Sequence, residues 1–248
     1  MLILRKLEGN NLFIDIGNTN TKIFNDAGLL VSLATTNVRV EKFLDHIKNE
    51  KIFISSVVPS ALERLEKELK AINKEYRVID ANSGFSFSAP YEDMGVDRLL
   101  AIEGALTLTK SSCAIVDSGS AITVELIVYR DGGAFLESGI IIPGFSLSLK
   151  ALNDYTALLP LITPSLPNDF MGHNTNEAMN NGVCYSIVRG VEGIIDDVKA
   201  KMGLDELKLF VTGGAGLLFK NIASKDFTYV DDLMFRGMKS IANKEVNR

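Results

Sequence analysis

Residues 15–22, Asp-Ile-Gly-Asn-Thr-Asn-Thr-Lys, bring together side chains that suit phosphate chemistry. Gly17 permits a tight turn in which successive backbone N–H groups face an anion. Residues 18–20 add side-chain donors, and Lys22 can reach a phosphate as a point charge. Asp15, at the end of an apolar run, can hold hydrated Mg²⁺, which keeps several waters and takes few protein ligands. By itself the segment is equally compatible with a plain hairpin whose lysine faces solvent.

The same pattern returns in the second half of the chain. Residues 12–21 and 114–123 each contain an apolar strand that ends in Asp, followed by any residue, Gly and a small polar residue. Because internal repeats can decide a fold, this self-similarity predicts two related α/β domains. Asp15 and Asp117 would then converge on one cleft, which is costly unless a cation lies between the two carboxylates. The repeat therefore favours a functional site over a plain hairpin.

The apolar patterns around these motifs predict the elements that position them. The expected strands of the first half are residues 12–16, 22–24, 29–34, 52–57 and 76–79, and the expected helices are residues 40–49, 61–71 and 97–109. We expect two domains, residues 1–111 and 112–248, each with a mixed five-stranded sheet and flanking helices. The second domain carries an insertion, at about residues 144–175, that the first lacks.

The composition argues against several classes of partner and of binding site. The formal net charge is −5 and Lys and Arg form no long run, so neither a nucleic acid nor an anionic membrane is an expected partner. Cys113 and Cys184 lack the dense framework of a secreted domain, and we expect both to be reduced and buried. With only His46 and His173 present, a bound ion should be a hard cation with oxygen ligands. The chain shows neither a signal peptide nor an apolar run of about 20 residues, which predicts a soluble, cytoplasmic protein.

The motif at residues 15–22 resembles the phosphate-binding signature of the type III pantothenate kinases, a family with duplicated ribonuclease-H-like domains of the actin and sugar-kinase type. The resemblance continues in order along nearly the whole chain. The matching segments are Ser55–Pro59, Gly95–Arg98, Val116–Ala121, Pro143–Gly144, Thr156–Pro160, Asn174–Thr175 and Thr212–Gly214. Each segment alone is a weak signal, whereas the ordered series is specific. It implies the α/β fold of the actin-like ATPases, with a cleft between the two domains.

This resemblance implies ATP-dependent phosphorylation of pantothenate to 4′-phosphopantothenate, the first step of coenzyme A biosynthesis. It assigns ATP binding to Asp15, Ile16, Gly17, Asn18, Thr19, Asn20, Thr21, Lys22 and Ser120. It assigns pantothenate binding to Tyr91, Gly95, Val96, Asp97, Arg98 and Thr175, with Asp97 as the catalytic base. The implied ions are Mg²⁺, held by Asp15 through water, and a monovalent cation, K⁺ or NH₄⁺, at Asp117. The family works as a homodimer, and the insertion would supply an apolar interface that includes Leu147, Leu149, Leu152 and Leu158–Leu161.

Residues 95–98, Gly-Val-Asp-Arg, have both structural and functional interpretations. Asp is a favoured N-cap, and Asp97 precedes an apolar helical stretch. The implied role as a base is compatible with capping, because a base in phosphoryl transfer mainly orients the nucleophile. Arg98 either binds the pantothenate carboxylate with two parallel hydrogen bonds or forms an ordinary surface ion pair. Thr175, in turn, either contacts pantothenate or caps a helix that starts near residue 176.

Several positions depart from the family's pattern. The segment between Tyr91 and Gly95 is shorter than usual, which leaves the role of Tyr91 open. Ser120 replaces the usual threonine but keeps the hydroxyl. Glu125 stands where Asp is commoner, and Lys150 stands where many members carry His.

Two other functions remain to be weighed. One is a kinase for another small hydroxyl substrate, since related enzymes share the fold. The other is a non-catalytic accessory or regulatory protein of the same fold. The joint presence of Asp15, Asp97, Arg98 and Asp117 favours an active enzyme, because a pure binding module has no need for all of them.

Overall fold

The computed structural model describes residues 11–43, 51–89 and 93–246. The chain divides into two compact units. The first takes the described parts of Met1–Ser86, Tyr91–Leu108 and Asp232–Arg248, and the second takes those of Phe87–Pro90 and Thr109–Asp231. The middle junction lies near the boundary expected at residue 111. The C-terminal segment, expected in the second domain, packs instead with the first unit.

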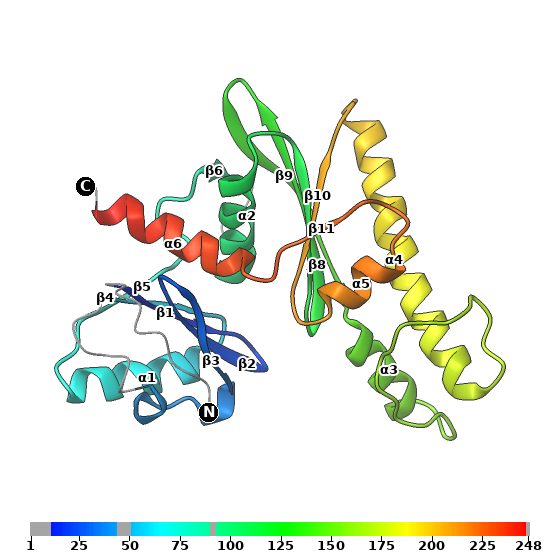
Figure 1. Ribbon diagram of the computed structural model, residues 1–248, viewed down its shortest axis with the longest axis horizontal. Coiled ribbons are helices and arrows are strands. Elements are labelled where there is room, and N and C mark those ends of the chain that lie inside the picture. The colour runs from blue at the N-terminus through cyan, green and yellow to red at the C-terminus, as the bar shows by residue number, and fades with distance from the viewer. Residues whose placement is uncertain (1–10, 44–50, 90–92, 247–248) are drawn as a thin grey trace. The chain divides into compact units, whose positions relative to one another are not determined.

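The first unit is built on a five-stranded sheet in the order β3-β2-β1-β4-β5 (Figure 1). Its strands are β1 (Asn11–Ile16), β2 (Asn20–Asn25), β3 (Gly28–Ala34), β4 (Lys51–Ser56) and β5 (Tyr76–Val78). The first three form an antiparallel meander, and β4 and β5 continue the sheet in parallel with β1. All five strands predicted for the first half of the chain are therefore confirmed.

Helices α1 (Pro59–Ala71), α2 (Val96–Leu108) and α6 (Leu233–Val246) accompany this sheet. The short 3₁₀ turns η1 (Thr35–Asn37) and η2 (Val40–Lys42) follow β3. The helix predicted at residues 40–49 is thus a 3₁₀ turn where it is described, and residues 44–50 lie outside the described parts of the chain.

The second unit repeats the plan of the first. Its sheet has the order β11-β10-β7-β8-β9-β6, with strands β6 (Phe87–Ser88), β7 (Cys113–Ser118), β8 (Ala121–Arg130), β9 (Gly133–Pro143), β10 (Lys208–Thr212) and β11 (Thr228–Tyr229). An antiparallel meander, here β7 to β9, is again followed by two strands parallel to its first strand. This shared connectivity confirms the duplication. The sixth strand, β6, was not predicted, because two residues carry no periodic pattern.

The insertion of the second unit begins with a helix and continues as turns and loops up to the next helix. It contains α3 (Phe145–Asp154) and the start of α4 (Thr175–Lys201), and α5 (Gly216–Ile222) follows β10. These helices cover one face of the second sheet, where Val116, Phe145, Val188 and Phe219 are buried in one cluster. Within the described ranges, no helix combines the length and the apolar character needed to cross a membrane.

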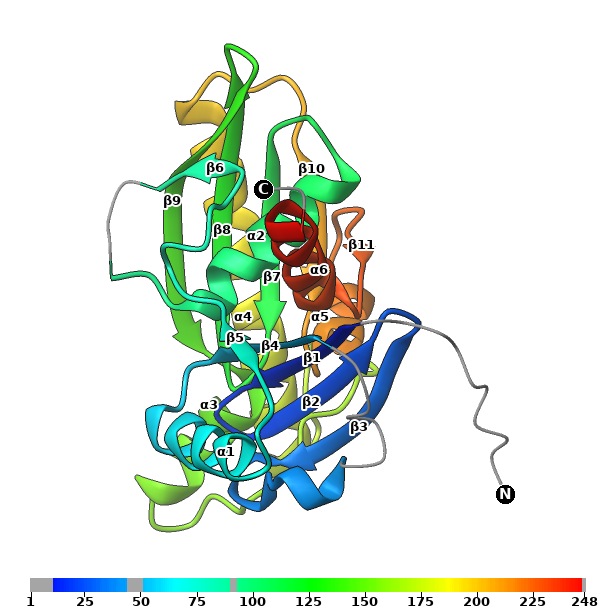
Figure 2. The same cartoon turned by 90° about the vertical axis from the view of Figure 1, so that its left-hand side faces the viewer.

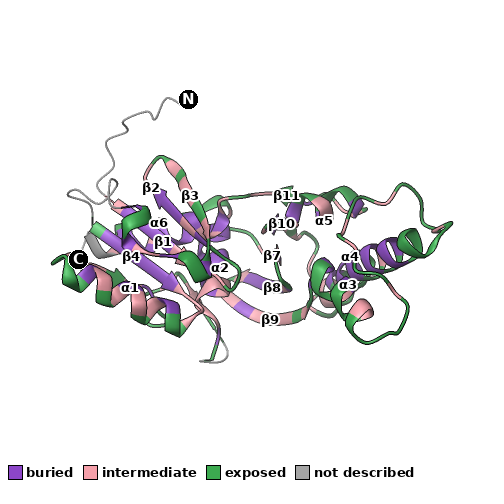
Figure 3. Cartoon of the chain, turned by 90° about the horizontal axis from the view of Figure 1, so that it is seen from below, coloured by how far each residue is buried: buried purple, intermediate pink, exposed green. Residues whose placement is uncertain are grey.

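Alternate residues of the first sheet face opposite layers of helices, as the pleat of a strand requires. On one face, Leu12, Ile14 and Ile16 are buried against Leu65 and Leu69 of α1 (Figure 3). On the other face an aromatic cluster packs against α2 and α6, with members Phe13, Phe24, Phe53, Leu100, Phe235 and Met238. The first sheet is therefore covered by helices on both faces.

Two glycines let α2 and α6 pack with their backbones close together (Figure 2). A Cβ atom on Gly104 would collide with the carbonyl oxygen of Leu233, and one on Gly237 would collide with the carbonyl oxygen of Leu100. A larger residue at either position would force the two helices apart.

A buried carboxylate fastens these helices to the segment that precedes β6. Glu103 of α2 is 1% exposed and accepts hydrogen bonds from the Ser86 backbone N–H (2.7 Å), the Ser240 hydroxyl (2.6 Å) and the Lys244 ammonium (2.7 Å). Burial alone would raise the pKa of Glu103, but the hydrogen bonds from Lys244, Ser240 and Ser86 outweigh it and hold the pKa below its usual value. The network therefore stabilises the fold fully above about pH 4.3, the ordinary pKa of Glu, and this contribution is lost as the pH falls through the folded-state pKa.

We expect Glu103→Gln to lower the free energy of unfolding at pH 7 by about 2 kcal/mol, because the Lys244 ammonium loses its anion and an amide cannot satisfy every donor. Urea unfolding measures the change. The difference from the wild type should shrink as the pH falls from about 4.3 through the lowered folded-state pKa of Glu103, where the wild-type carboxylate itself becomes protonated. The control is Glu63→Gln on the exposed face of α1, which should change stability by less than about 0.5 kcal/mol. Equal stability of the two variants would contradict the role of the network.

Candidate functional site

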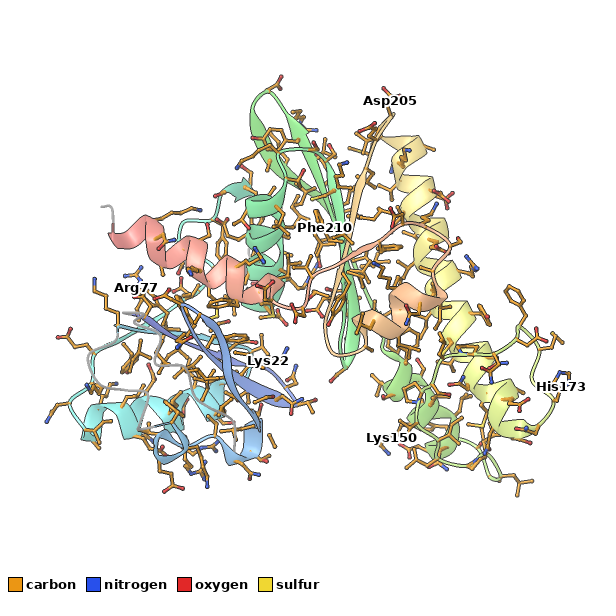
Figure 4. All side chains as sticks on the ribbon, viewed as in Figure 1. Lys22, Arg77, Lys150, His173, Asp205 and Phe210 are labelled. Carbon is orange, nitrogen blue, oxygen red and sulfur yellow. The ribbon has the colours of Figure 1, made fainter. Side chains whose placement is uncertain are left out.

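Residues 15–22 form the hairpin that joins β1 to β2. Asp15 lies opposite Lys22 in the antiparallel register, and residues 17–20 make the turn. The Gly17 N–H donates a hydrogen bond of 3.0 Å to the Asn20 carbonyl oxygen, and a Cβ on Gly17 would lie 3.0 Å from that same oxygen. The side chains at the tip are exposed, whereas Asp15 and Lys22 are half-buried (Lys22 is labelled in Figure 4). The motif is thus a hairpin with a close turn that favours glycine. The tip of this turn carries exposed donors.

Asp15 lies on the face of the first sheet that carries the aromatic cluster, because it follows Phe13 by two positions. Lys22 on β2 and Ser55 on β4 are its direct neighbours across the strands, so these three side chains share one face. Ser55 is 1% exposed, and its hydroxyl has no hydrogen-bond partner among the described residues. An unpaired buried hydroxyl costs about 1–3 kcal/mol. Ser55 is therefore a buried hydroxyl beside Asp15 without a partner among the described residues.

The oxygen atoms of Asp15 and Ser55 fit a hydrated Mg²⁺ ion. Among the described residues, no group of three or more His, Cys, Asp or Glu side chains lies close enough together to hold a metal ion. A Mg²⁺ ion at this place would thus rely on water and on phosphate oxygens, as this ion prefers. No role was predicted for Ser55, because its place beside Asp15 depends on which strand pairs with β1.

Helix α2 begins one residue earlier than predicted, which changes the place of Asp97. The Gly95 carbonyl oxygen accepts the N–H groups of Arg98 (3.1 Å) and Leu99 (3.3 Å), so Gly95 is the residue that precedes the helix. Asp97 lies in the first turn, and its predicted N-cap position was wrong. Its Oδ1 accepts the Arg98 N–H at 2.8 Å, and the positive end of the helix dipole favours a carboxylate there. A Cβ on Gly95 would lie 2.5 Å from this oxygen, so glycine makes room for the Asp97 side chain.

The start of α2 lies on the same face of the first sheet as Asp15. Val96 packs against the aromatic cluster that contains Phe13 and Phe53. Asp97, the next residue, is half-buried. Within the first unit, the structure therefore brings the predicted phosphate turn and the predicted base to one face of one sheet.

The second unit holds the matching hairpin at the end of β7. Asp117 lies opposite Thr123 on β8 and beside Thr212 on β10, so these three side chains share one face of the second sheet. Glu125, 1% exposed, follows Thr123 on that face. The set contains only carboxylate and hydroxyl oxygens, which fits a hard cation.

The second turn differs from the first in length and charge. It is one residue shorter, so Thr123 lies opposite Asp117 where the first hairpin has Lys22. Ser120 is exposed at its tip. Gly213, with φ of +91°, comes so close to Asp117 that a Cβ there would collide with the carboxylate. The close approach and the left-handed backbone both require glycine at this position.

Thr175 opens helix α4 without capping it. The Asn174 side chain accepts the Glu177 N–H at 3.0 Å, and the Glu177 carboxylate accepts the His173 N–H at 2.8 Å. This pair satisfies the helix start, so the capping alternative for Thr175 was wrong. The Thr175 side chain is exposed, and the next residues, Asn176 and Glu177, line a hollow of about 380 Å³.

Tyr91 and His46 lie outside the described parts of the chain. Lys150 pairs with Asp154 one helical turn later, at 2.7 Å. Both cysteines are buried, as predicted; burial raises the pKa of Cys113 to about 12 and that of Cys184 to about 11, so both thiols stay protonated and unreactive.

The family model for type III pantothenate kinases matches residues 11–197 of this chain. A type III pantothenate kinase from Caulobacter vibrioides is 32% identical over 198 residues, which cover 77% of this chain and 74% of the relative. The matched span includes both hairpins and the start of α2.

Two crystal structures share the fold. One, from Campylobacter jejuni and described as a Baf family transcriptional activator, matches with a TM-score of 0.64 and 27% identity over 96% of this chain and 100% of its own. The other, described as a 2-dehydro-3-deoxygalactonokinase from Sinorhizobium meliloti, has a TM-score of 0.60 and 10% identity over 95% of this chain and 99% of its own, a likeness of fold alone. The two α/β units thus share the fold of these two structures. On the family match and the site geometry together, the chain belongs to the type III pantothenate kinase family.

Proposed function

We propose that this chain transfers the γ-phosphoryl group of ATP to the hydroxyl group of pantothenate. The product is 4′-phosphopantothenate, and the reaction is the first step of coenzyme A biosynthesis. The observation that carries the proposal is the family match over residues 11–197, which spans both hairpins and the start of α2.

The hairpin at residues 15–22 binds the ATP phosphates. Its tip offers exposed backbone and side-chain donors, and Lys22 adds a positive charge. Asp15 and Ser55 hold water molecules of Mg²⁺, an ion that offsets phosphate charge when it is bound. In the second unit, the exposed hydroxyl of Ser120 supplies a further contact to ATP.

Asp97 accepts the proton of the pantothenate hydroxyl and points that hydroxyl at the γ-phosphorus. The transition state of phosphoryl transfer is loose, so orientation matters more than the strength of the base. Gly95 and the Arg98 N–H already fix the Asp97 carboxylate in one position. Arg98 binds the pantothenate carboxylate, because its planar guanidinium offers two parallel donors. The other pantothenate contacts come from Val96, Thr175 and Tyr91.

Asp117 binds a monovalent cation, K⁺ or NH₄⁺. The hydroxyls of Thr123 and Thr212 share its face of the second sheet, so three oxygen-bearing side chains can replace part of the ion's hydration shell. This ion adds positive charge that offsets the phosphates of ATP.

The chain forms a homodimer through the insertion of the second unit. Tyr155 and Leu158 are 88% and 92% exposed, and Leu161 and Phe170 are 66% and 65% exposed. Extended apolar surfaces of this kind mark protein–protein interfaces. Leu149, which the sequence placed in this interface, is fully buried in the core of the second unit. We also propose a cytoplasmic location for the protein.

The Campylobacter jejuni structure raises a second function, regulation without catalysis. The net charge of −5 gives this chain little general attraction for the phosphates of DNA. The joint presence of Asp15, Asp97, Arg98 and Asp117 also exceeds what a protein that only binds requires. Catalysis is therefore the function we favour, and turnover with pantothenate separates the two.

The purified protein is expected to release ADP from ATP and Mg²⁺ only when pantothenate is present, and faster in K⁺ than in Na⁺ buffer. The Asp117→Asn variant should lose the K⁺ dependence and at least about tenfold in kcat, because one interaction that offsets phosphate charge is worth 1.4 kcal/mol or more. A coupled ADP assay measures both effects.

Two outcomes would contradict this expectation. Faster ADP release with another small hydroxyl compound would assign a different acceptor. No turnover with any acceptor, from folded protein that still binds ATP, would favour the regulator.

Asp97→Asn should lower kcat by about 10²-fold or more, because the amide cannot accept the hydroxyl proton. The fold should survive, since Asn keeps the shape of the side chain and the exchange removes only the favourable charge at the helix start, about 0.5 kcal/mol. Steady-state kinetics and the melting temperature together measure the two effects. Asp93→Asn, an exposed aspartate four positions earlier, is the matched control. Near-full activity of the Asp97 variant would remove its catalytic assignment.

The double variant Leu158→Glu, Leu161→Glu should be a monomer, because two buried charges without partners cost far more than the lost apolar contact. Light scattering at assay concentrations measures the molar mass. The control is Leu217→Glu, which places a charge on a leucine of α5 that is 53% exposed and should leave the dimer intact. A monomeric wild-type protein would rule out the interface.

A further inference from the structure

Thr35 contacts the phosphate-binding hairpin from outside its motif. It is the first residue of η1, directly after β3, and is 5% exposed. Its hydroxyl donates a hydrogen bond of 2.6 Å to the Gly17 carbonyl oxygen, and its N–H donates one of 3.0 Å to the Thr19 carbonyl oxygen. Two of the carbonyl groups in the turn are therefore held by one residue.

These two bonds also fix the direction of two N–H groups. A trans peptide unit is planar, and its C=O and the following N–H point in opposite directions. With the Gly17 and Thr19 carbonyls turned toward Thr35, the N–H groups of Asn18 and Asn20 point away from it. The side chains of both asparagines are exposed, so both residues lie at the solvent-facing tip of the hairpin.

The Thr35 hydroxyl is itself held in place. It lies 3.2 Å from the hydroxyl of Thr21, which is fully buried. Because Thr35 donates to Gly17, Thr21 can donate to Thr35, and the two hydroxyls form a short buried chain of hydrogen bonds. Hydrogen bonds in such a chain strengthen one another, so the two hydroxyls hold the turn more stiffly than a single hydrogen bond would. The Thr35 carbonyl also accepts a hydrogen bond of 3.3 Å from the Arg64 guanidinium.

The second hairpin has the corresponding backbone hydrogen bond but lacks the hydrogen bond from a side-chain hydroxyl. Gly144, directly after β9, donates its N–H to the Ser120 carbonyl oxygen at 3.0 Å, as Thr35 does to Thr19. A Cβ on Gly144 would collide with the Gly119 carbonyl oxygen. Of these two hairpins, only the first has a turn carbonyl that is held by a threonine hydroxyl.

We propose that Thr35 is a positioning residue for nucleotide binding, which holds the N–H groups of Asn18 and Asn20 toward the phosphates. Phosphate binding by a turn requires N–H groups that converge on the anion before it arrives, since ordering them on binding costs affinity. The hydroxyl, rather than the methyl group, performs this role. The inference rests on the proposed binding of ATP at residues 15–22.

The test compares Thr35→Val, which keeps the shape and removes the hydroxyl, with Thr35→Ser, which keeps the hydroxyl. Thr35→Val should weaken the binding of ATP with Mg²⁺ about tenfold by calorimetry, the worth of one good hydrogen bond. The KM for pantothenate should stay within about twofold, and Thr35→Ser should bind ATP like the wild type. The control is Thr107→Val, which also removes a 2.6 Å bond from a threonine hydroxyl to a carbonyl, that of Gly104, away from the turn.

Unchanged ATP affinity in Thr35→Val would overturn the inference, as would equal losses for ATP and pantothenate, which indicate general damage. A second measurement needs only the wild type. The amide resonances of Asn18 and Asn20 should shift when ATP and Mg²⁺ saturate the protein, and if neither shifts the inference is wrong even where Thr35→Val fails to fold. Saturable ATP binding with these shifts but no turnover of pantothenate would refute the proposed function and leave the role of Thr35 intact.

Discussion

The candidate site depends on one constraint, the two-residue alternation of side chains along β1. Phe13 and Asp15 face the same side, so the strand that seats the aromatic cluster against α2 and α6 also presents Asp15 there. The register with β2 and β4 then places Lys22 and Ser55 beside it. A slip of one residue would turn Asp15 toward the apolar face under α1, where an unpaired charge is costly. The same pairing therefore stabilises the core and builds the site.

Duplication of this plan produced two hairpins that suit ligands of opposite charge. The first has Lys22 opposite its aspartate and a turn whose N–H groups are directed by Thr35. The second is one residue shorter and carries Thr123 in the place of the lysine. It also lacks a hydrogen bond from a side-chain hydroxyl to a carbonyl of the turn. The two hairpins thus differ in turn length and in single residues, while the order of the five strands around each of them stays the same.

The sequence predicted those parts of the molecule that local pattern determines. The strands around Asp15 and Asp117 are continuous apolar runs that end in an acid, and both were predicted correctly. The N-cap assignment of Asp97 failed because Gly95, whose carbonyl oxygen accepts the first N–H groups of α2, is itself a residue type that commonly caps a helix. Ser55 and Thr35 were not identified as site residues, since their roles depend on pairings between segments far apart in sequence. The return of α6 to the first unit has the same origin.

The position of Asp97 depends on the far end of the chain. Helix α2 is held by Gly104 and Gly237, which let its backbone touch that of α6, and by Glu103, which binds Ser240 and Lys244 of α6. Until α6 is in place, the aromatic face of the first sheet lacks part of its cover, and an exposed apolar face of this kind is a risk for aggregation. The first unit therefore reaches its final structure only when the last helix has been made. The position of Asp97 and the cooperative stability of the unit are then set in the same step, because the contacts that complete the core also hold the helix from which Asp97 projects.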